Sequence, residues 1–501
     1  MAIDCSWLQK RSQLSPSKVA VIDGESGERW NYQQLYARTI DMKNRLHSLG
    51  IKKGDSVALL SPNEMVYFDL LFACGELGAI FVPLNWRLSN DELVYILQDC
   101  DAKYLLVHPT MIGKVRIGPC PIISIDDLPQ PADSQQNRVS VDLNNPAAII
   151  YTGGTTGKPK GVILTHENII SNAINTIISW GLSEDDATLT CLPMFHTGGL
   201  NALSSPLLMA GGTVVLMQDF EVEKVIDFLC MYQCTVVLMV PTMYHILIEH
   251  PRFQKESFPS MKTFLSGGAP CPIEIYEAFY KKGKLFKEGY GLTEAGPNNF
   301  YIDPKEAYGK KGSVGKPMMF NEVKIMKNKN EEASVNEVGE IYLKGRHVFR
   351  EYWLKPEETQ KVKVDGWLCT GDLGRMDEEG YFYIVGRVKD MIISGGENVY
   401  PSEVEQTLAE HTAVKEVCVV GIPHPKWGEG VLAVVSLKSP ASEKELTTFC
   451  SQKLGKYKIP KKFAFVKDIP KTTVGKFDKK SIIQTYKEIF KLPEEIQEMK
   501  N

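Results

Sequence analysis

Short apolar runs rich in β-forming residues alternate with amphipathic segments of helical length over the first 300 residues. The apolar runs predict strands at 57–60, 104–107, 147–151, 188–192, 213–217, 235–240 and 263–265. The segments between them predict helices at 64–78, 91–98, 168–180, 221–232 and 272–281. Regular alternation of strand and helix is typical of parallel α/β sheets whose two faces are both covered by helices, and this is the fold class that we expect.

The pattern changes after about residue 310. Short strands are predicted at 323–326, 340–343 and 381–385 with few helices between them, which indicates a small β-barrel subdomain over about 310–386. A polar junction follows at 386–390, and the remaining chain predicts helices at 402–410 and 443–453 with strands at 416–420 and 431–437. We therefore expect an N-terminal lobe over 1–386, built from α/β subdomains and the barrel, and a small α+β domain over 387–501.

The charge balance and the cysteines exclude several classes of protein. The 501 residues include 57 Lys and Arg against 61 Asp and Glu, a net charge of −4, so no basic excess favours nucleic acid. The N-terminal residues lack the apolar core of a secretory signal, and the most apolar stretch, 70–84, is interrupted by Glu76 and Pro83. The 11 cysteines form no C-x-x-C pair and show no zinc spacing. We expect free thiols in a cytoplasmic protein without a transmembrane segment.

The strongest local signal is the segment 151–161 (YTGGTTGKPKG), which follows a predicted strand. Its glycines allow consecutive backbone N–H groups to form an anion-binding nest, and its threonines and lysines add hydroxyl donors and positive charge. Pro159 follows Lys158, so the segment is not the P-loop of NTPases, which needs Ser or Thr there. The composition indicates a phosphate-binding loop. A flexible surface hairpin is the alternative.

Five other clusters occur at wide spacing: 192–200 (LPMFHTGGL), 266–270 (SGGAP), 289–294 (GYGLTE), 367–372 (WLCTGD) and 470–476 (PKTTVGK). Each is weak alone, because a lone His196 is more often a packing residue and a Gly-Asp pair is more often a turn. Their order and content, with 386–390 (GRVKD), resemble the adenylate-forming superfamily of acyl-CoA synthetases, peptide-synthetase adenylation domains and firefly luciferase. The resemblance spans about 30–480. One departure is Gly153, where many members carry Ser.

The resemblance implies an acid–thiol ligase that uses ATP and Mg²⁺ to form an acyl-adenylate with release of pyrophosphate, then transfers the acyl group to coenzyme A. The loop would hold the β- and γ-phosphates through Thr152, Gly153, Gly154, Thr155, Thr156, Gly157, Lys158 and Lys160. The adenosine would be held by Tyr290 and Gly291, by Gly267, Gly268, Ala269 and Pro270 on the opposite side, and by Asp372 and Arg387 at the ribose. Glu294 would bind Mg²⁺, Thr293 would touch the α-phosphate, and Lys476 would bridge the substrate carboxylate and the α-phosphate.

For the second half-reaction, the resemblance implies that the small domain rotates about Lys389. Rotation would withdraw Lys476 and bring Gly395 and Gly396 to the site, where they leave room for the pantetheine arm of coenzyme A. His196 would flank the acyl site and the thiol tunnel as a gate more than a base.

The acyl pocket is expected between 196–203, 241–245, 266–268 and 293–300. Small and apolar residues there suit an aliphatic or aromatic acid: Gly198, Gly199, Leu200, Val240 and Met243. The stretch most resembles that of fatty-acid-type acyl-CoA synthetases, including 194–200, and this resemblance favours a medium- or long-chain fatty acid. The basic residues in this region that could bind a second carboxylate of the substrate are limited to His196 and His245. Asn298 and Asn299 could point at a functionalised acid or at solvent.

Three alternatives stay open from the sequence. The o-succinylbenzoate and 4-coumarate ligases share the scaffold, so an aryl acid is one. A stand-alone adenylation enzyme that loads a carrier protein is the second, and a non-catalytic binding protein is the third, although Lys476, Glu294 and Asp372 are all present. The expected partners are a small carboxylic acid, ATP and coenzyme A, with a homodimer as a further possibility.

Overall fold

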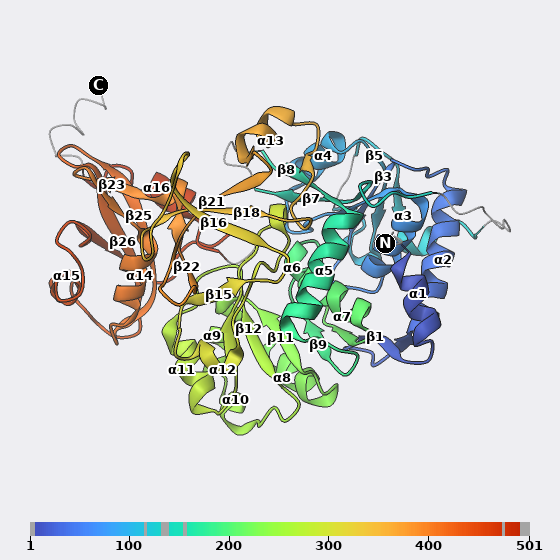
Figure 1. Ribbon diagram of the computed structural model, residues 1–501, viewed down its shortest axis with the longest axis horizontal. Coiled ribbons are helices and arrows are strands. Elements are labelled where there is room, and N and C mark those ends of the chain that lie inside the picture. Colours follow the sequence, from blue (N-terminus) through green and yellow to red (C-terminus); the bar gives the residue numbers. More distant parts are fainter. Residues whose placement is uncertain (1–5, 115–117, 132–139, 154–157, 473–475, 491–501) are drawn as a thin grey trace.

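The computed structural model of the chain describes residues 6–114, 118–131, 140–153, 158–472 and 476–490 (Figure 1). It has a large lobe built on three sheets and a small domain on a fourth sheet, drawn in orange and red at the left of Figure 1. This arrangement confirms the predicted fold class.

The first sheet has the strand order β13-β12-β11-β9-β10-β1-β2, and only the pair β1 and β2 is antiparallel. Its strands are β1 (Val19–Asp23), β2 (Arg29–Asn31), β9 (Ala187–Thr190), β10 (Thr213–Leu216), β11 (Val236–Met239), β12 (Thr263–Ser266) and β13 (Phe286–Glu288). The helices that follow its strands are α8 (Val222–Met231), α9 (Pro241–Glu249), α10 (Pro251–Lys255) and α11 (Ile273–Lys281). A buried aromatic cluster joins these helices to the sheet, with Phe279 of α11 packed on Phe264 and Phe286.

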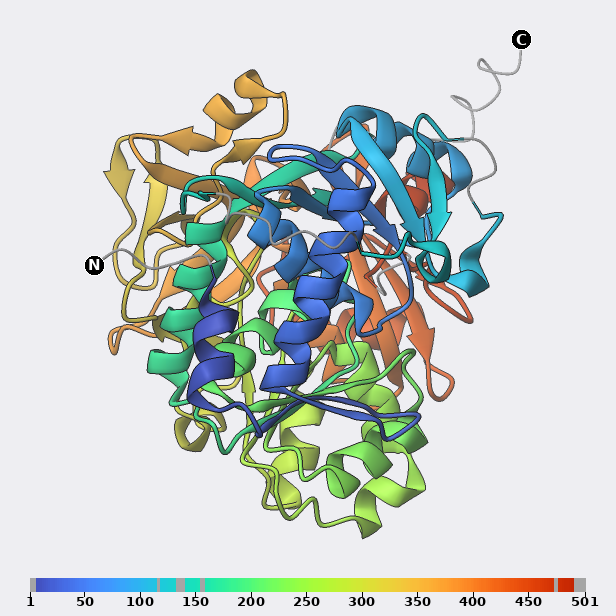
Figure 2. The ribbon, with the colours of Figure 1, turned by 90° about the vertical axis from the view of Figure 1, so that its right-hand side faces the viewer.

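The second sheet has the order β19-β8-β7-β4-β3-β5-β6. Its strands are β3 (Ser56–Leu60), β4 (Ile80–Pro83), β5 (Ala102–Val107), β6 (Ile122–Ser124), β7 (Pro146–Thr152), β8 (Lys160–Thr165) and β19 (Glu351–Tyr352). The helices are α1 (Trp7–Leu14), α2 (Tyr32–Ser48), α3 (Val66–Leu77), α4 (Asn90–Asp99), α5 (His166–Trp180), α6 (Thr197–Asn201) and α7 (Ser204–Ala210), with single turns η1 (Pro109–Met111) and η2 (Ile125–Asp127). Figure 2 shows α1, α2 and α5 on the side of the large lobe away from the small domain.

The second sheet departs from the parallel arrangement at one edge. Strand β8 runs antiparallel to β7, with Thr152 paired directly to Lys160, and β19 runs antiparallel to β8. The connection between β7 and β8 is too short for the helical crossover that a parallel pair needs. The predicted phosphate loop is therefore the connection of a β-hairpin.

The third sheet is antiparallel, in the order β14-β15-β22-β21-β18-β16-β17, with β20 beside β21. Its strands are β14 (Phe300–Tyr301), β15 (Ser313–Pro317), β16 (Glu322–Asn328), β17 (Glu331–Glu332), β18 (Gly339–Lys344), β20 (Lys363–Val364), β21 (Trp367–Met376) and β22 (Phe382–Arg387). Nearby are α12 (Pro304–Ala307), α13 (Pro356–Val362) and the turn η3 (Thr293–Ala295). This sheet is the predicted β-rich subdomain.

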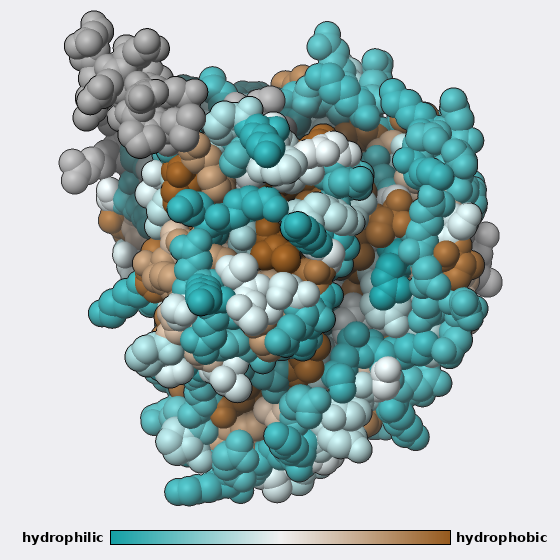
Figure 3. All heavy atoms as spheres, turned by 90° about the vertical axis from the view of Figure 1, so that its left-hand side faces the viewer, coloured by the Kyte–Doolittle hydropathy of each residue, from teal (hydrophilic) through white to brown (hydrophobic). Residues whose placement is uncertain are grey.

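The small domain follows the turn η4 (Val388–Asp390). Its strands are β23 (Ile392–Ser394), β24 (Glu397–Val399), β25 (Val414–His424), β26 (Gly428–Leu437) and β27 (Lys462–Phe465), and its helices are α14 (Pro401–Ala409), α15 (Glu443–Ser451) and α16 (Lys479–Tyr486). Separate apolar clusters lie on the two faces of its sheet. Seen from its side, the surface is mainly hydrophilic, with apolar side chains in small separate groups (Figure 3).

Polar contacts between described residues join the small domain to the large lobe in this arrangement. The Ser402 hydroxyl donates to the carbonyl of Val385, and Lys438 forms an ion pair with Glu274 of α11 at 3.1 Å. The domain boundary at residue 386 stays a prediction. Within the described residues, no helix is long and apolar enough to cross a membrane, and the ten cysteines are free thiols.

Candidate active site

Parallel strands bring the predicted clusters together at one edge of the first sheet. Strands β9, β11, β12 and β13 run in the same direction, so the segments that follow them begin at the same edge. The N–H of Gly289 donates to the carbonyl of Ser266 at 2.8 Å, and that of Gly267 donates to Met239 at 3.3 Å. Gly267 is half-buried and Gly268, Ala269 and Pro270 are exposed, so this wall is open to a ligand.

Asp372 links this edge to the third sheet. Its carboxylate accepts hydrogen bonds from the Tyr290 hydroxyl at 2.6 Å and from Arg387 Nε at 2.6 Å, and it is 5% exposed. Register places Asp372 directly opposite Arg387 on β21 and β22. Burial lowers the pKa of Arg387, but the charge and the hydrogen bond of Asp372, with Tyr290 and Asp390, together raise the pKa above its usual value, so the guanidinium stays charged. The structure thus brings together three of the residues predicted to hold adenosine, Tyr290, Asp372 and Arg387, and Gly291 follows Tyr290 directly in the chain.

The predicted Asp372–Arg387 ribose contact can be tested by Asp372→Asn, which keeps the shape of the side chain and removes its charge. We expect KM for ATP to rise about tenfold or more, because a hydrogen bond to a charged group contributes about 1.5–3 kcal/mol. Steady-state kinetics of AMP release measure this change. Asp377→Asn on the same sheet, paired with Lys310, is the matched control. An unchanged KM for ATP would contradict the assignment.

Glu294 lies in the turn η3, which begins at Thr293. Its Oε1 accepts a hydrogen bond from the Tyr352 hydroxyl at 2.8 Å, and its backbone carbonyl accepts one from Phe349 N at 2.7 Å. Burial raises the pKa of the Glu294 carboxyl, and the Tyr352 bond opposes that change.

The donor set around Glu294 fits Mg²⁺ that arrives with a nucleotide. The described residues contain no group of three His, Cys, Asp or Glu side chains arranged for a metal. Mg²⁺ commonly takes one or two carboxylates and completes its shell with phosphates and water. A carboxylate has about four lone-pair positions, and Tyr352 uses one of them at Glu294.

The two lysines of the predicted phosphate loop lie on aromatic side chains. The Lys158 ammonium is 5.2 Å from the ring centroid of Tyr95, and that of Lys160 is 5.3 Å from the centroid of Tyr352. Lys160 also forms an ion pair with Glu358 of α13. Thr152 and exposed Gly153 lie at the end of β7. The predicted ligands Gly154, Thr155, Thr156 and Gly157 fall outside the described residues.

The small domain contributes Lys476 to this edge. The Lys476 side chain is exposed, yet desolvation lowers its pKa; the charges of Arg387 and Lys389 lower the pKa further, and Asp372 opposes them. Burial likewise lowers the pKa of His196 to about 4, with contributions from Lys476 and Arg87. The Lys476 charge therefore lies close enough to Asp372, Arg387 and His196 to interact with them electrostatically. The role of His196 as a gate stays a prediction.

The predicted coenzyme A residues lie elsewhere in this arrangement. Gly395 and Gly396 form the exposed turn between β23 and β24, where Gly395 N donates to the Trp427 carbonyl at 2.8 Å. Lys389 lies in the turn η4, between the two domains, and burial and Arg387 lower its pKa. The contacts of Gly395 described here lie within the small domain, and the coenzyme A role of the glycine pair stays a prediction.

One expectation for the acyl pocket is wrong. Asn298 is buried and donates to Thr176 Oγ1 at 3.0 Å and to the Ala202 carbonyl at 2.7 Å, while Asn299 bonds His347 at 2.9 Å. Both asparagines pair with protein groups instead of facing an acid or solvent. His245 pairs with Glu274 at 3.1 Å and Glu249 at 3.3 Å, so these carboxylates compete for its charge.

Tyr352, Glu358 and Arg87 were not found by the sequence analysis. Tyr352 bonds Glu294 across 58 residues of chain, and Glu358 pairs with Lys160 across 198. Arg87 lies over the rings of Trp86 and Phe195, centroid distances 4.5 and 5.8 Å, beside His196. None lies in a glycine-rich cluster, and no local signal in the sequence marks contacts of such range.

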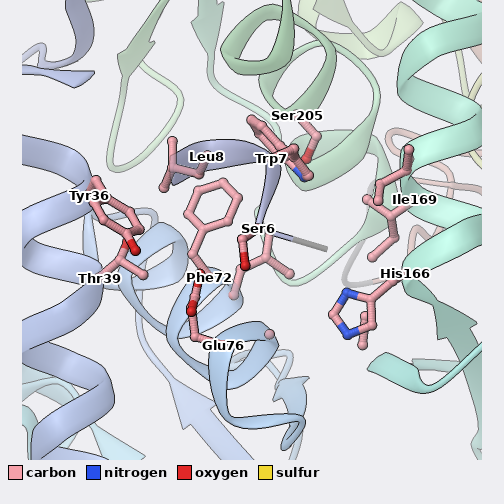
Figure 4. A pocket seen from close by; sticks show the side chains of 14 residues that line it. Ser6, Trp7, Leu8, Tyr36, Thr39, Phe72, Glu76, His166, Ile169 and Ser205 are labelled. Carbon is pink, nitrogen blue, oxygen red and sulfur yellow. The ribbon is translucent and has the colours of Figure 1, made fainter. Parts of the chain in front are cut away.

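A separate cavity lies among α1, α3, α5 and α7 (Figure 4). Its walls include Trp7, Phe72, Glu76 and His166, and it contains none of the predicted site residues. His166 Nε2 is buried without a hydrogen-bond partner, and burial lowers the pKa of its ring to about 4. His166 begins α5 at the end of β8 opposite the loop, so this cavity is distinct from the candidate site.

Known proteins are similar to this chain in sequence and fold over nearly its whole length. Residues 8–353 match the AMP-binding enzyme family, and residues 403–476 match the AMP-binding enzyme C-terminal domain. A feruloyl-CoA synthase from Amycolatopsis sp is 38% identical over 94% of this chain and 96% of its own length. An indoleacetate–CoA ligase from Aromatoleum aromaticum is 34% identical over 95% and 97%. A 2-succinylbenzoate–CoA ligase from Bacillus licheniformis is 37% identical over 94% and 98%.

Solved structures agree with the sequence relatives. ATP-bound MatB from Rhodopseudomonas palustris aligns with a TM-score of 0.89 and 31% identity, over 98% of this chain and all of that one. The o-succinylbenzoate CoA synthetase from Bacillus subtilis, in complex with its acyl-adenylate intermediate, aligns with a TM-score of 0.85 and 34% identity over 95% and 97%. The chain therefore belongs to the AMP-binding enzymes, among the acid–CoA ligases of the adenylate-forming superfamily.

Proposed function

We propose that this protein is an ATP-dependent aryl–CoA ligase, which activates an aromatic carboxylic acid as its adenylate and transfers the acyl group to coenzyme A. The observation that carries the adenylation step is the contact of Asp372 with Tyr290 and Arg387, with the Lys476 charge close enough to Asp372 and Arg387 to interact with them. Two anions, a carboxylate and the α-phosphate, have to meet there, and fixed positive charge lowers the barrier to their approach. Mg²⁺ at Glu294 would neutralise further phosphate charge.

Packing next to His196 supports an aryl acid over the fatty acid that the sequence suggested. Leu200, Ala202 and Leu203 are buried in the large lobe, so this stretch fills the core instead of lining a channel. A Cβ on Gly199 would lie 2.4 Å from the Pro193 carbonyl, so α6 packs directly on that backbone. A long alkyl chain on this side would have to displace core packing, whereas a flat ring would not.

The remaining wall suits a planar, apolar group. Val240 and Met243 are half-buried beside the Ser266–Pro270 segment, and a Cβ on Gly268 would meet Val240 Cγ1 at 3.6 Å. Phe195 adds a buried ring next to His196, with centroids 4.6 Å apart. The named activities of the relatives, on ferulate, indoleacetate and 2-succinylbenzoate, all concern aromatic acids.

A panel of acids tests the proposal. AMP release with ATP, Mg²⁺ and coenzyme A is measured for ferulate, indoleacetate, 2-succinylbenzoate and benzoate against octanoate and palmitate. We expect kcat/KM for at least one aromatic acid to exceed both alkanoates by about tenfold or more, the discrimination that pocket shape supplies. Preference for an alkanoate would overturn the aryl assignment. Acyl-adenylate formation without transfer to coenzyme A would instead indicate the stand-alone adenylation enzyme.

A further inference from the structure

Tyr352 lies on β19, which is hydrogen-bonded to β8, the strand that follows the phosphate loop. Strand β19 pairs with β8 in the register Tyr352 opposite Val162, and the N–H of Trp353 donates to the Gly161 carbonyl at 2.7 Å. A Cβ on Gly161 would lie 2.7 Å from Ile149 Cγ2 and 3.1 Å from the Tyr151 ring, so only glycine permits this approach. The N–H of Tyr352 also donates to Thr359 Oγ1 at 2.9 Å, which joins it to α13.

The side chain of Tyr352 contacts the predicted Mg²⁺ ligand Glu294 and the predicted phosphate ligand Lys160. Its hydroxyl donates to Glu294 Oε1 at 2.8 Å, and the ammonium of Lys160 lies 5.3 Å from its ring centroid. Phe349 packs against the ring at a centroid distance of 4.9 Å with an interplanar angle of 61°, and Tyr352 is 8% exposed. The ring is therefore held in one orientation between a carboxylate and a cation.

Glu358 holds Lys160 from the other side. Its carboxylate pairs with Lys160 and with Lys361, and these contacts lower the pKa of Glu358 to about 2. Lys160 thus has an anion on α13 and an aromatic face on β19. The Lys160 ammonium and the Glu294 carboxylate have opposite charges, and both contact Tyr352, the ammonium at the ring face and the carboxylate at the hydroxyl.

We propose that Tyr352 is a positioning residue that holds Glu294 and Lys160 apart and correctly oriented, so that a metal–triphosphate complex meets both groups in one arrangement. The proposal rests on the proposed use of ATP. The hydroxyl restricts the Glu294 carboxylate, and the ring face restricts the Lys160 ammonium. A rigid arrangement lowers the entropic cost of binding the metal and the phosphates together.

The test measures metal binding directly and does not depend on turnover. Mn²⁺ replaces Mg²⁺ as an EPR probe, and its affinity is measured in the ternary complex with ATP. We expect Tyr352→Phe to weaken Mn²⁺ affinity about tenfold, the fold-change typical of a lost hydrogen bond to a charged group. In a Glu294→Gln background the same change should have no further effect, since the acceptor charge is gone. Tyr104→Phe is the matched control, because its hydroxyl donates to the Leu49 carbonyl at 3.1 Å.

The outcomes separate this proposal from the proposed function. Equal Mn²⁺ affinity in the wild type and Tyr352→Phe overturns the positioning role and leaves the ligase assignment intact. Failure of the wild type to bind Mn²⁺ with ATP overturns both. A crystal structure of Tyr352→Phe gives a second measurement, in which we expect the Glu294 carboxylate to have left the orientation that the Tyr352 hydroxyl holds. If the variant does not fold, Glu358→Gln should release Lys160 and weaken metal–ATP binding, and unchanged binding there would also overturn the proposal.

Discussion

Replacing Lys476 with alanine is expected to reduce the rate of ATP–pyrophosphate exchange by about 100- to 1000-fold, the cost of removing one preorganised electrostatic group from a reacting centre. The ammonium interacts electrostatically with Asp372, Arg387 and His196, near which the attacking carboxylate and the α-phosphate are expected to meet. Exchange of labelled pyrophosphate into ATP, with a saturating acid, measures this half-reaction alone.

The second half-reaction provides the contrast. Thioester formation from a supplied acyl-adenylate should proceed within about threefold of the wild-type rate, because Lys476 has no expected role after the adenylate forms. Lys480→Ala is the control, since this exposed lysine lies four residues away on α16. Unchanged pyrophosphate exchange in Lys476→Ala would refute the assigned role, and equal loss of both half-reactions would indicate a general defect.

Replacing Lys389 with proline is expected to leave adenylation within about threefold of the wild type and to slow thioester formation about 100-fold or more. Lys389 is the central residue of η4, and a 3₁₀ turn has a φ close to the one that proline imposes. Proline at position 389 is therefore compatible with the domain arrangement of this structure, which is the one expected for adenylation. Rotation about this residue would need a different φ, and misplacement of a catalytic group by about 1 Å costs about 100-fold.

Single-turnover measurements of the two half-reactions test the hinge. Lys389→Ala is the matched control, because it removes the same ammonium and keeps the backbone freedom. We expect it to retain both half-reactions. If Lys389→Pro forms thioester at the wild-type rate, the predicted rotation is wrong for this protein, and if both variants lose the second half-reaction, the side chain matters instead of the hinge.

Local patterns were sufficient for most of the secondary structure. The apolar run predicted at 57–60 is β3, and the amphipathic segments at 168–180 and 443–453 became α5 and α15 with small shifts at their ends. The 17-residue helix α2 was missed, although Asn31 and Gln34 form a capping box at its start. Its polar residues outweigh its apolar ones, so the periodic signal is weak where the cap signal is strong.

Local patterns likewise located some residues of the candidate site and missed others. The glycine-rich clusters could be located because a backbone that approaches a phosphate or a ring needs particular residues at fixed spacing. Tyr352 and Arg87 could not be located in this way, because a tyrosine or an arginine alone is common on any surface. The polar character of Asn298 and Asn299 was visible, but only the fold decided that Thr176, Ala202 and His347 would pair with them.

By itself, the sequence determined the fold class, the family and the residue types available for adenylation, since these depend on periodicity and on short conserved spacings of chemical groups. Only the tertiary structure decided which of those groups meet. The direction of β8, the pairing of Asp372 with Tyr290 and Arg387, and the entry of Lys476 beside His196 all depend on contacts between distant segments. Such contacts follow from the packing of whole sheets and domains, which local patterns do not specify.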